Sequence, residues 1–378
     1  MQSVDAGGLG IGDGYPPRVM GVLNVSDESP YDPSVFTDPA EAAAYVDGSL
    51  IDEGAAIVDV GLESANKRFD VLSAEQELER LKTALAILDR VEGEAVFSIE
   101  TRYAAVVDAA LAGGFDMVND ICGFADPALP EVCAAHGVPA VKMAGPGDLD
   151  RPGALETVDE IYDALAADPL PPHTIVDPAF GGWSEGKTVA VDRETFRRLR
   201  EFQALDRPLL VSINRKNFLR HLAGRSTADA LPVSLGATAM AVERGANVLR
   251  THDVAATKDA ALIGHAFRQD RFADVDLGVR ALDVTTDDEL SRHLDRIGAP
   301  SNDPAGMPHV LELADLDAVE RTLVQTMTDA TACTVYVGAV DAPILLRGTA
   351  AALDDLRQLV NGEAPTVTAA LDAFLADQ

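Results

Sequence analysis

Eight short runs rich in β-branched residues alternate with longer helix-periodic segments over most of this chain. Such a repeat is typical of βα units laid on a parallel sheet. Eight units within roughly 250 residues have the size and rhythm of a closed (β/α)8 barrel. An open doubly wound sheet is the alternative, but it usually begins with a GxGxxG turn, which is absent here. We therefore predict an α/β chain built on a (β/α)8 TIM barrel, with strands in the runs that start near residues 19, 56, 95, 116, 138, 173, 208 and 247.

The rhythm changes after about residue 276, where short runs and helices follow a Pro/Gly/Asn-rich segment, GAPSNDPAGMP. We expect three parts: an N-terminal extension at 1–17, the barrel at 18–275, and a smaller α+β domain at 276–378. The last part contains no cluster of His, Cys or paired carboxylates that we can assign to chemistry. We expect it to serve as a scaffold or an oligomerisation module.

The chain is strongly acidic, with 62 Asp and Glu against 30 Lys and Arg and a formal net charge of -32. This balance argues against nucleic acid and anionic membranes as partners. It suits a halophilic protein kept soluble at high salt, where the Debye length is ~3 Å at 1 M. The N-terminus lacks a basic segment followed by an apolar one, and no apolar run reaches the ~20 residues of a membrane span. We expect a cytoplasmic protein, and three cysteines without a CxxC pair fit a reducing compartment without structural zinc.

Costly polar residues gather where the predicted strands end, which is where the active sites of such barrels lie. They are Asn24, Glu63, Lys67, Glu100, Asn119, Asp120, Lys142, Asp177, Lys187, Asn214, Arg215, Lys216, Arg250, His252 and Asp253. Strand ends also meet solvent, which by itself makes them polar. That explanation does not account for lysine, because four of the six lysines in the chain fall on this rim.

Asp177 follows an apolar TIV run and precedes a proline, so we expect its carboxylate to be partly buried. A buried charge is expensive without a partner and favours a cationic or donor-rich neighbour. Together with Asn119 and Glu100, it can accept hydrogen bonds from a flat heterocycle rich in N–H donors, while Lys216 can donate to a ring carbonyl.

Arg250 and His252 follow the last predicted strand, and Asn24 ends the first, across the barrel. These three side chains suit an anion such as phosphate, bound directly or through a divalent metal.

Six short segments stand out beyond these single residues. They are MGVLNVSDES at 20–29, SIETR at 98–102, ND at 119–120, DPAFG with GKT between 177 and 188, RK at 215–216 and RTHDV at 250–254. In this order and at these intervals they resemble the signature segments of dihydropteroate synthases. The resemblance covers about residues 18–270 and does not extend to residues 277–378.

The resemblance implies a transferase of folate biosynthesis that joins 6-hydroxymethyl-7,8-dihydropterin diphosphate to 4-aminobenzoate and releases diphosphate. It also implies Mg²⁺ and a homodimer. Arg250, His252 and Lys216 would be the catalytic residues, and Arg250 and His252 would hold the leaving diphosphate. The implied substrate-binding residues are Glu100, where the family usually has Asp, and Asn119, Met143, Asp177, Arg215, Lys216, Asn217 and Arg250. Asn24 would bind the metal or the diphosphate.

The chain also departs from the family pattern, mainly where the second substrate would bind. Family members usually carry Ser-Thr-Arg-Pro-Gly after the second strand, whereas residues 64–68 read SANKR. Asn214 and Asn217 replace the serines that usually flank the Arg-Lys pair. A related arylamine with a larger substituent is therefore a possible acceptor, with Lys67 or Arg68 facing its anionic group.

Two other functions remain open from the sequence. Methyltransferases that act on methyl-tetrahydrofolate share this barrel and a pterin site, but they have no use for a diphosphate site such as Arg250, His252 and Asn24. A non-catalytic pterin-binding protein would explain the altered loops and the extra domain.

Overall fold

The computed structural model describes residues 3–26, 34–64, 71–147, 155–166, 170–181, 187–268, 273–274, 279–280, 282–298, 306–313, 316–337 and 344–376. The chain divides into two compact units, Met1–Asp270 and Arg271–Gln378. We describe each unit by itself.

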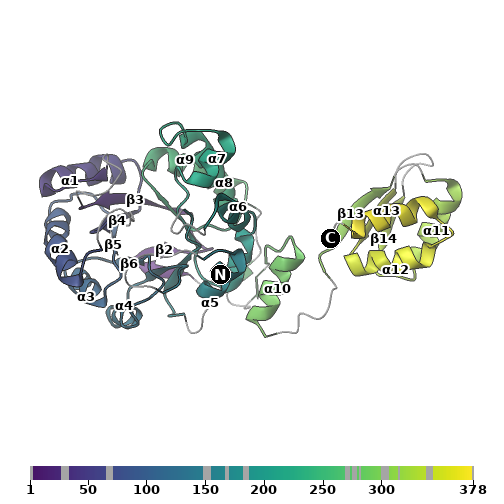
Figure 1. Ribbon diagram of the computed structural model, residues 1–378, viewed down its shortest axis with the longest axis horizontal. Helices are drawn as coiled ribbons and strands as arrows, with labels where there is room; N and C mark the ends of the chain where they lie inside the picture. The colour runs from purple at the N-terminus through teal and green to yellow at the C-terminus, as the bar shows by residue number, and fades with distance from the viewer. Residues whose placement is uncertain are drawn as a thin grey trace. The chain divides into compact units, whose positions relative to one another are not determined.

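Eight parallel strands form the centre of the first unit, with helices outside them (Figure 1). Their order in the sheet is β8-β7-β6-β5-β4-β3-β10-β9, and a parallel bridge between Val176 and Leu209 joins the two ends. The predicted (β/α)8 barrel is therefore confirmed. The strands are β3 (Arg18–Asn24), β4 (Ile57–Gly61), β5 (Val96–Glu100), β6 (Met117–Asp120), β7 (Ala140–Met143), β8 (Thr174–Asp177), β9 (Leu210–Val211) and β10 (Val248–Thr251).

A layer of helices follows the strands in sequence. They are α1 (Pro39–Tyr45) with the π-helix Val46–Ile51, α2 (Ala74–Leu88), α3 (Ala104–Ala112), α4 (Leu129–His136), α5 (Val158–Ala166), α6 (Val189–Arg197) with the 3-10 helix Leu199–Leu205, α7 (Asn217–Ala223), α8 (Leu231–Glu243) and α9 (Val254–Ala266). Helix α2 begins at Ser73, whose side chain and Gln76 form a capping box, which satisfies backbone N–H groups of the first turn. Helices α8 and α9 approach closely at Gly264, where a Cβ atom would lie 2.3 Å from the carbonyl oxygen of Ala239.

A hairpin of two short strands, β1 (Val4–Ala6) and β2 (Leu9–Ile11), seals the N-terminal end of the barrel. Its side chains Val4, Ala6 and Ile11 pack on one inward-facing residue from each barrel strand. We call this ring the apolar layer: Met20, Ile57, Val96, Met117, Val141, Ile175, Leu210 and Val248. The segment expected to be an extension is therefore the closure of this end.

Side chains two residues apart on a strand point to the same face. On five of the strands, the inward side chain two residues after the apolar layer is polar or charged. Ile57 is followed by Asp59, and Val96 is followed by Ser98 and Glu100. We call the resulting set the polar layer: Asp59, Ser98, Glu100, Asn119, Asp177 and Arg250. It lies above the apolar layer, at the carboxyl ends of the strands.

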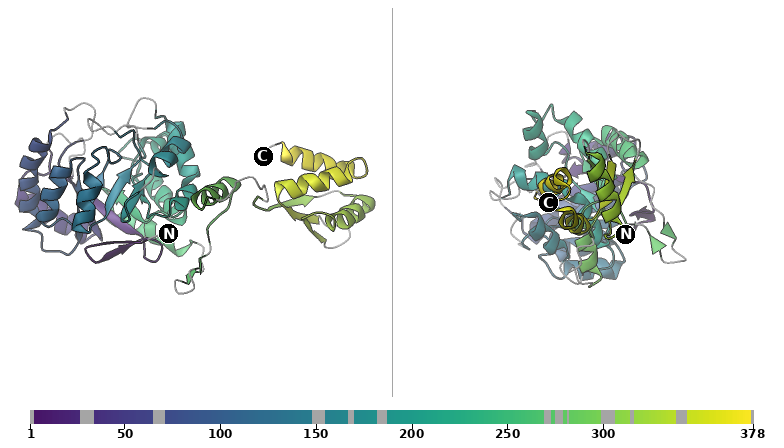
Figure 2. Two further views of the ribbon diagram at one scale, coloured as in Figure 1. Left: turned by 90° about the horizontal axis from the view of Figure 1, so that it is seen from below. Right: turned by 90° about the vertical axis from the view of Figure 1, so that its right-hand side faces the viewer.

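The second unit contains a three-stranded antiparallel sheet of order β13-β15-β14. Its elements are β11 (Ala273–Asp274), β12 (Val279–Arg280), α10 (Asp287–Arg296), β13 (His309–Leu313), α11 (Ala318–Thr328), β14 (Thr334–Val337), β15 (Ile344–Gly348), α12 (Ala350–Val360) and α13 (Pro365–Leu375). Leu346 of β15 lies in one core with Val324, Leu356 and Leu371 of helices α11, α12 and α13, and α12 and α13 run side by side (Figure 2). Among the described residues of the whole chain, no helix is long and apolar enough to cross a membrane.

Candidate active site

The centre of the polar layer is a buried network around Asp59 of β4, whose side chain is 0% exposed. Its Oδ1 accepts a hydrogen bond from Ser98 Oγ (2.7 Å), and its Oδ2 accepts from Asn119 Nδ2 (2.9 Å) and Arg250 Nε (2.7 Å). Arg250 also donates from Nη2 to Glu100 Oε2 (2.6 Å). The guanidinium of Arg250 thus bridges two carboxylates that arise from neighbouring strands.

Glu100 experiences opposing effects in this network. Burial raises its pKa to about 7, with Asp59 and Glu63 acting in the same direction and Arg250 and Lys216 in the other. The carboxyl group is therefore poised between its charged and neutral forms near neutral pH. Its Oε2 also lies 3.5 Å from Asn119 Nδ2.

Asp177 ends β8 and is 5% exposed, as the sequence predicted. Its Oδ1 accepts from the backbone N–H of Ala179 (2.7 Å). Burial raises its pKa, and that hydrogen bond and the charges of Lys216 and Lys187 oppose the rise. Ala179 has φ +61°, a left-handed conformation that costs an alanine about 1 to 2 kcal/mol.

Lys187 holds this turn in place. Its ammonium donates to the carbonyl oxygen of Ala179 and lies 3.3 Å from Asp192 Oδ1 of α6. Lys187 is 6% exposed, so this rim lysine is buried behind Asp177 and ion-paired to a helix.

Lys216 precedes α7 and interacts electrostatically with Asp177 and Arg250. Burial and the positive charge of Arg250 lower its pKa to about 8, while Asp177 and Asp192 act in the opposite direction. A cation held in this way stays charged at neutral pH but at a free-energy cost.

Arg215, the neighbour of Lys216, has φ +52° and is tied to the surrounding loops. Its Nε and Nη2 donate to Asp253 (2.8 and 3.0 Å), and its Nη1 donates to the carbonyl oxygens of Thr227 and Ala228 (2.8 and 2.7 Å). Asn214 donates to the same carboxylate, Asp253 Oδ2 (2.9 Å). The bonds from Arg215 and Asn214 outweigh burial and lower the pKa of Asp253.

His252 follows β10, and its backbone N–H lies 3.5 Å from Asn214 Oδ1. Burial and the charges of Arg250 and Lys216 lower the pKa of its imidazole to about 3. The ring is therefore neutral at neutral pH and can donate one hydrogen bond to an anion.

Asn24 ends β3, and its Nδ2 donates to Ser34 Oγ (2.9 Å). This bond leaves the carbonyl oxygen Oδ1 directed toward Gly61, where a Cβ atom would lie 3.2 Å from it. Within the described ranges, no group of three or more His, Cys, Asp or Glu side chains could hold a metal ion. One amide oxygen still suits Mg²⁺, which keeps several waters and is commonly bound through one or two protein ligands plus substrate phosphates.

Three further residues from the sequence analysis lie in different surroundings. Met143 is 2% exposed and pairs in register with Asp177. Asn217 is exposed in the first turn of α7 and accepts a hydrogen bond from Arg220. Lys142 points away from the barrel interior and donates to the carbonyl oxygen of Ala164 in α5 (2.7 Å), so its assignment to the rim was wrong. Lys67 and Arg68 lie outside the described residues.

The sequence analysis missed a second buried network, which adjoins Glu100. Arg102, 4% exposed, is ion-paired with Glu63, and Thr101 donates to Glu77 of α2. These residues, together with Glu100 and Ile121, line a small pocket. Burial raises the pKa of Glu77 to about 7. Glu63 also accepts from the backbone N–H of Leu72 (3.3 Å), so it links the residues on both sides of the altered SANKR segment.

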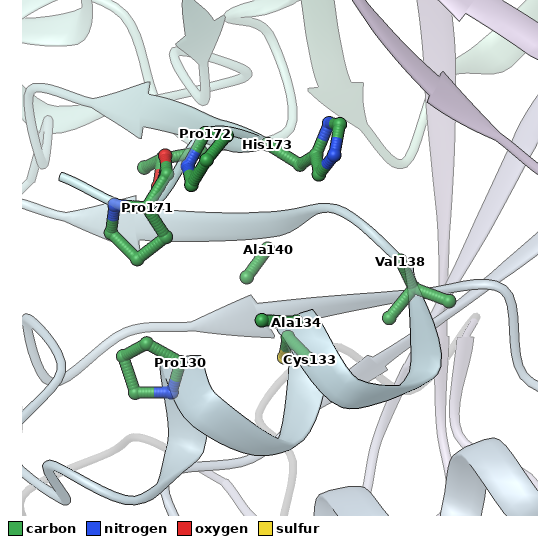
Figure 3. A pocket seen from close by; sticks show the side chains of 9 residues that line it. Pro130, Cys133, Ala134, Val138, Ala140, Pro171, Pro172 and His173 are labelled. Atoms are coloured by element: carbon green, nitrogen blue, oxygen red, sulfur yellow. The ribbon is translucent and has the colours of Figure 1, made fainter.

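Another small pocket lies at the opposite end of the barrel. It is lined by residues of α4, by the segments that precede β7 and β8 and by the first residue of each of these strands: Pro130, Cys133, Ala134, Val138, Ala140, Pro171, Pro172, His173 and Thr174 (Figure 3). Its lining is mostly apolar. It lies at the amino ends of the strands, whereas the polar layer lies at their carboxyl ends. It is not the candidate active site.

A parallel barrel with a network of carboxylates, an amide and an arginine at the carboxyl ends of its strands is the scaffold of a small-molecule enzyme. Residues 20–252 match the family described as pterin binding enzyme. The chain therefore belongs to this family.

The relatives are more specific than the family. The dihydropteroate synthase of Neisseria meningitidis serogroup B is 32% identical over 267 residues, which cover 66% of this chain and 92% of that protein. The dihydropteroate synthase of Thermus thermophilus, solved with 4-aminobenzoate, matches with a TM-score of 0.58 and 29% identity, over 70% of this chain and 100% of that chain. The Coxiella burnetii enzyme, solved with pteroic acid, matches with a TM-score of 0.59 and 25% identity, over 71% of this chain and 99% of that chain.

Proposed function

We propose that the chain is a dihydropteroate synthase, a transferase that condenses 6-hydroxymethyl-7,8-dihydropterin diphosphate with 4-aminobenzoate or a related arylamine. The observation that carries this function is the polar layer, where Asp177, Asn119 and Glu100 offer acceptors around the cations Lys216 and Arg250. The relatives named above carry the same activity in their names. They do not favour the methyltransferase or the non-catalytic alternative.

The pterin ring lies against the polar layer. Asp177 and the amide oxygen of Asn119 accept hydrogen bonds from N–H groups at its edge, Lys216 donates to its carbonyl oxygen, and Arg250 covers one face with Met143 nearby. Glu100 accepts from ring N–H groups when it is ionised. These contacts fix the methylene carbon at which the reaction takes place, so positioning contributes much of the rate enhancement.

In the reaction, the C–O bond to diphosphate breaks as the arylamine nitrogen forms a bond to the methylene carbon. The diphosphate leaves with the electron pair, and the nitrogen loses a proton to solvent. Arg250 and the neutral imidazole of His252 stabilise the leaving anion as its charge develops. Asn24 would hold Mg²⁺ through Oδ1, and the ion would neutralise charge on the diphosphate.

Arg215 and Asn217 flank Lys216 and belong to the same proposal, Asn217 as a binding residue and Arg215 as a residue that positions its neighbours. The contacts of Arg215 with Asp253 and two carbonyl oxygens support a role in holding Lys216 and His252 rather than direct contact with substrate. The boundaries 1–17, 18–275 and 276–378 divide the chain into the seal, the pterin-binding barrel and a domain with a scaffold role.

In this proposal, the protein is cytoplasmic, forms a homodimer and is adapted to high salt. The net charge of -32 supports the salt adaptation. Exposed apolar side chains on the packed helices α8 and α9 support the dimer: Met240 (46%), Leu262 (51%), Ile263 (56%) and Phe267 (78%). Large apolar side chains exposed on two neighbouring helices support a contact with a second copy of the chain.

The experiment that tests the function is diphosphate release by the purified full chain at high salt with Mg²⁺ and the pterin diphosphate. Release that depends on 4-aminobenzoate supports the synthase. Binding of the pterin diphosphate without release in the presence of 4-aminobenzoate or of substituted arylamines would contradict it. Repeating the assay with a chelator tests the metal, because removal of Mg²⁺ is expected to lower the rate.

A further inference from the structure

Asp59 is the most deeply buried carboxylate of the polar layer, and it lies inside the apolar run AIVDVG. It lies inside β4 between the buried residues Val58 and Val60, and its side chain is 0% exposed. An ionised carboxylate in such a place is costly unless donors surround it. The partners of Asp59 therefore indicate why the chain keeps it there.

The three hydrogen bonds that Asp59 accepts from described residues come from side chains of other strands. Ser98 donates to Oδ1, and Asn119 and Arg250 donate to Oδ2, over 2.7, 2.9 and 2.7 Å. Asp120, the neighbouring buried carboxylate on β6, is used differently. Its two oxygens accept backbone N–H groups of Cys122 and Phe124, so Asp120 holds a loop whereas Asp59 holds side chains.

Two of the side chains held by Asp59 belong to the proposed pterin site. Asp59 binds Arg250 at Nε, and Glu100 binds the same guanidinium at Nη2 (2.6 Å). Two carboxylates bound to two different nitrogens of a planar guanidinium restrict both its position and the direction of its plane. The bond from Asn119 Nδ2 to Asp59 fixes the orientation of the amide, so that its oxygen, and not its nitrogen, is available to the pterin.

We propose that Asp59 is a positioning residue for the transferase reaction. It holds Arg250 and Asn119 from beneath the pterin, and it keeps the guanidinium of Arg250 in the plane required to cover the ring. We assign it no contact with the substrate itself, because its side chain is 0% exposed and its carboxylate oxygens bind Ser98, Asn119 and Arg250. The inference rests on the proposed function, since it assigns Asp59 a part in the same reaction.

The charge of Asp59 also affects Glu100. The charged groups that act on Glu100 are Asp59 of β4, Glu63 after β4, Arg250 of β10 and Lys216 before α7, and Asp59 is one of those that raise its pKa. Replacing Asp59 by Asn keeps the shape and one acceptor oxygen but removes the charge. Glu100 will then lose its proton at lower pH, and the acid side of the pH profile for pterin binding will move in the same direction.

The test compares the wild-type chain with Asp59→Asn and Asp120→Asn, a matched carboxylate-to-amide change on the next strand but one. For each, calorimetry gives the Kd of the pterin diphosphate from pH 5.5 to 8, and diphosphate release gives kcat and KM. We expect Asp59→Asn to raise the Kd about 30-fold, because Arg250 and Asn119 lose the charged acceptor that holds them, and to move the acid limb to lower pH. We expect Asp120→Asn to change the Kd less than about twofold, whatever its effect on stability.

The outcomes separate this inference from the proposed function. If the wild-type chain does not bind the pterin diphosphate, the proposed function fails, and this inference with it. If the wild-type chain binds and turns over but Asp59→Asn keeps both the Kd and the acid limb, only the positioning role is refuted. If Asp59→Asn does not fold, Ser98→Ala, which removes one donor to Asp59, replaces it. A three- to tenfold higher KM for the pterin diphosphate then supports the role, and an unchanged KM overturns it.

Discussion

Replacing Lys216 by methionine is expected to make the protein more stable and worse at binding its pterin substrate. The change keeps the length of the side chain and removes its charge. A lysine whose pKa falls from its ordinary value near 10.4 to about 8 carries its charge in the folded state at a cost of about 3 kcal/mol. Removing the charge therefore stabilises the folded state. The attraction to Asp177 is already part of that pKa, but Lys216 is partly exposed, so solvent screening reduces the gain. We therefore expect the free energy of unfolding at pH 7 to rise by about 1 to 2 kcal/mol.

The affinity for the pterin diphosphate should change in the opposite direction. A hydrogen bond from a charged donor contributes about 1.5 to 3 kcal/mol, so its loss raises the Kd about 10- to 100-fold. Calorimetric titration gives the affinity, and guanidinium unfolding followed by circular dichroism gives the stability. Lys258→Met is the matched control, because Lys258 is exposed on α9 and its loss should leave the unfolding free energy within about 0.5 kcal/mol.

Either measurement can refute the reasoning. An unchanged Kd removes Lys216 from the pterin site. A Lys216→Met protein that is less stable than the wild type would show that the charge of Lys216 is a net stabilising feature, and that attraction to Asp177 outweighs its burial.

Four further predictions concern His252, the pH dependence of binding, Glu77 and Ile263. His252→Ala should lower kcat at least 10-fold while changing the Kd of the pterin diphosphate less than threefold, because the imidazole acts on the departing diphosphate; equal losses in both would contradict this role. Affinity for the pterin diphosphate should be highest between about pH 7 and pH 8, since Glu100 gains a proton below about 7 and Lys216 loses one above about 8; a flat profile over pH 6 to 9 would disprove it. The pKa of Glu77 is raised in the folded state to about 7, so the wild type should lose up to about 3 kcal/mol of stability as the pH rises from 4.5 through 7, relative to Glu77→Gln; parallel curves for the two proteins would refute this. Ile263→Glu on the exposed face of α9 should turn a dimer into a monomer in sedimentation experiments, and a dimer of unchanged mass would exclude that face.

The barrel could be predicted because each of its strands is a short apolar run set between helix-periodic segments. The hairpin of β1 and β2 was not predicted, because two strands of three residues joined by Gly7 and Gly8 are too short to show a period. Their burial depends on the barrel end that they cover, which is a tertiary effect.

The side chains of the candidate site could be predicted where the chemistry of a residue conflicts with its surroundings, as at Asp177. Asp59 presents the same conflict inside AIVDVG, and this signal was available but was not used. Lys142 was assigned to the rim because it lies next to the end of a strand, but successive strand residues point to opposite faces, and its side chain leaves the barrel interior toward α5. The Glu63–Arg102 pair joins residues 39 positions apart, and one sequence offers no means of pairing them.

The seal at the N-terminal end of the barrel affects how the site exchanges protons. The apolar layer and the hairpin lie below the polar layer. A pterin bound at the carboxyl ends of the strands therefore covers the ionisable groups of the polar layer from the opposite side. Glu100, with a pKa of about 7, then meets ring N–H donors that favour its ionised form. Binding of the pterin diphosphate near neutral pH should therefore release protons, and its measured enthalpy should depend on the ionisation enthalpy of the buffer.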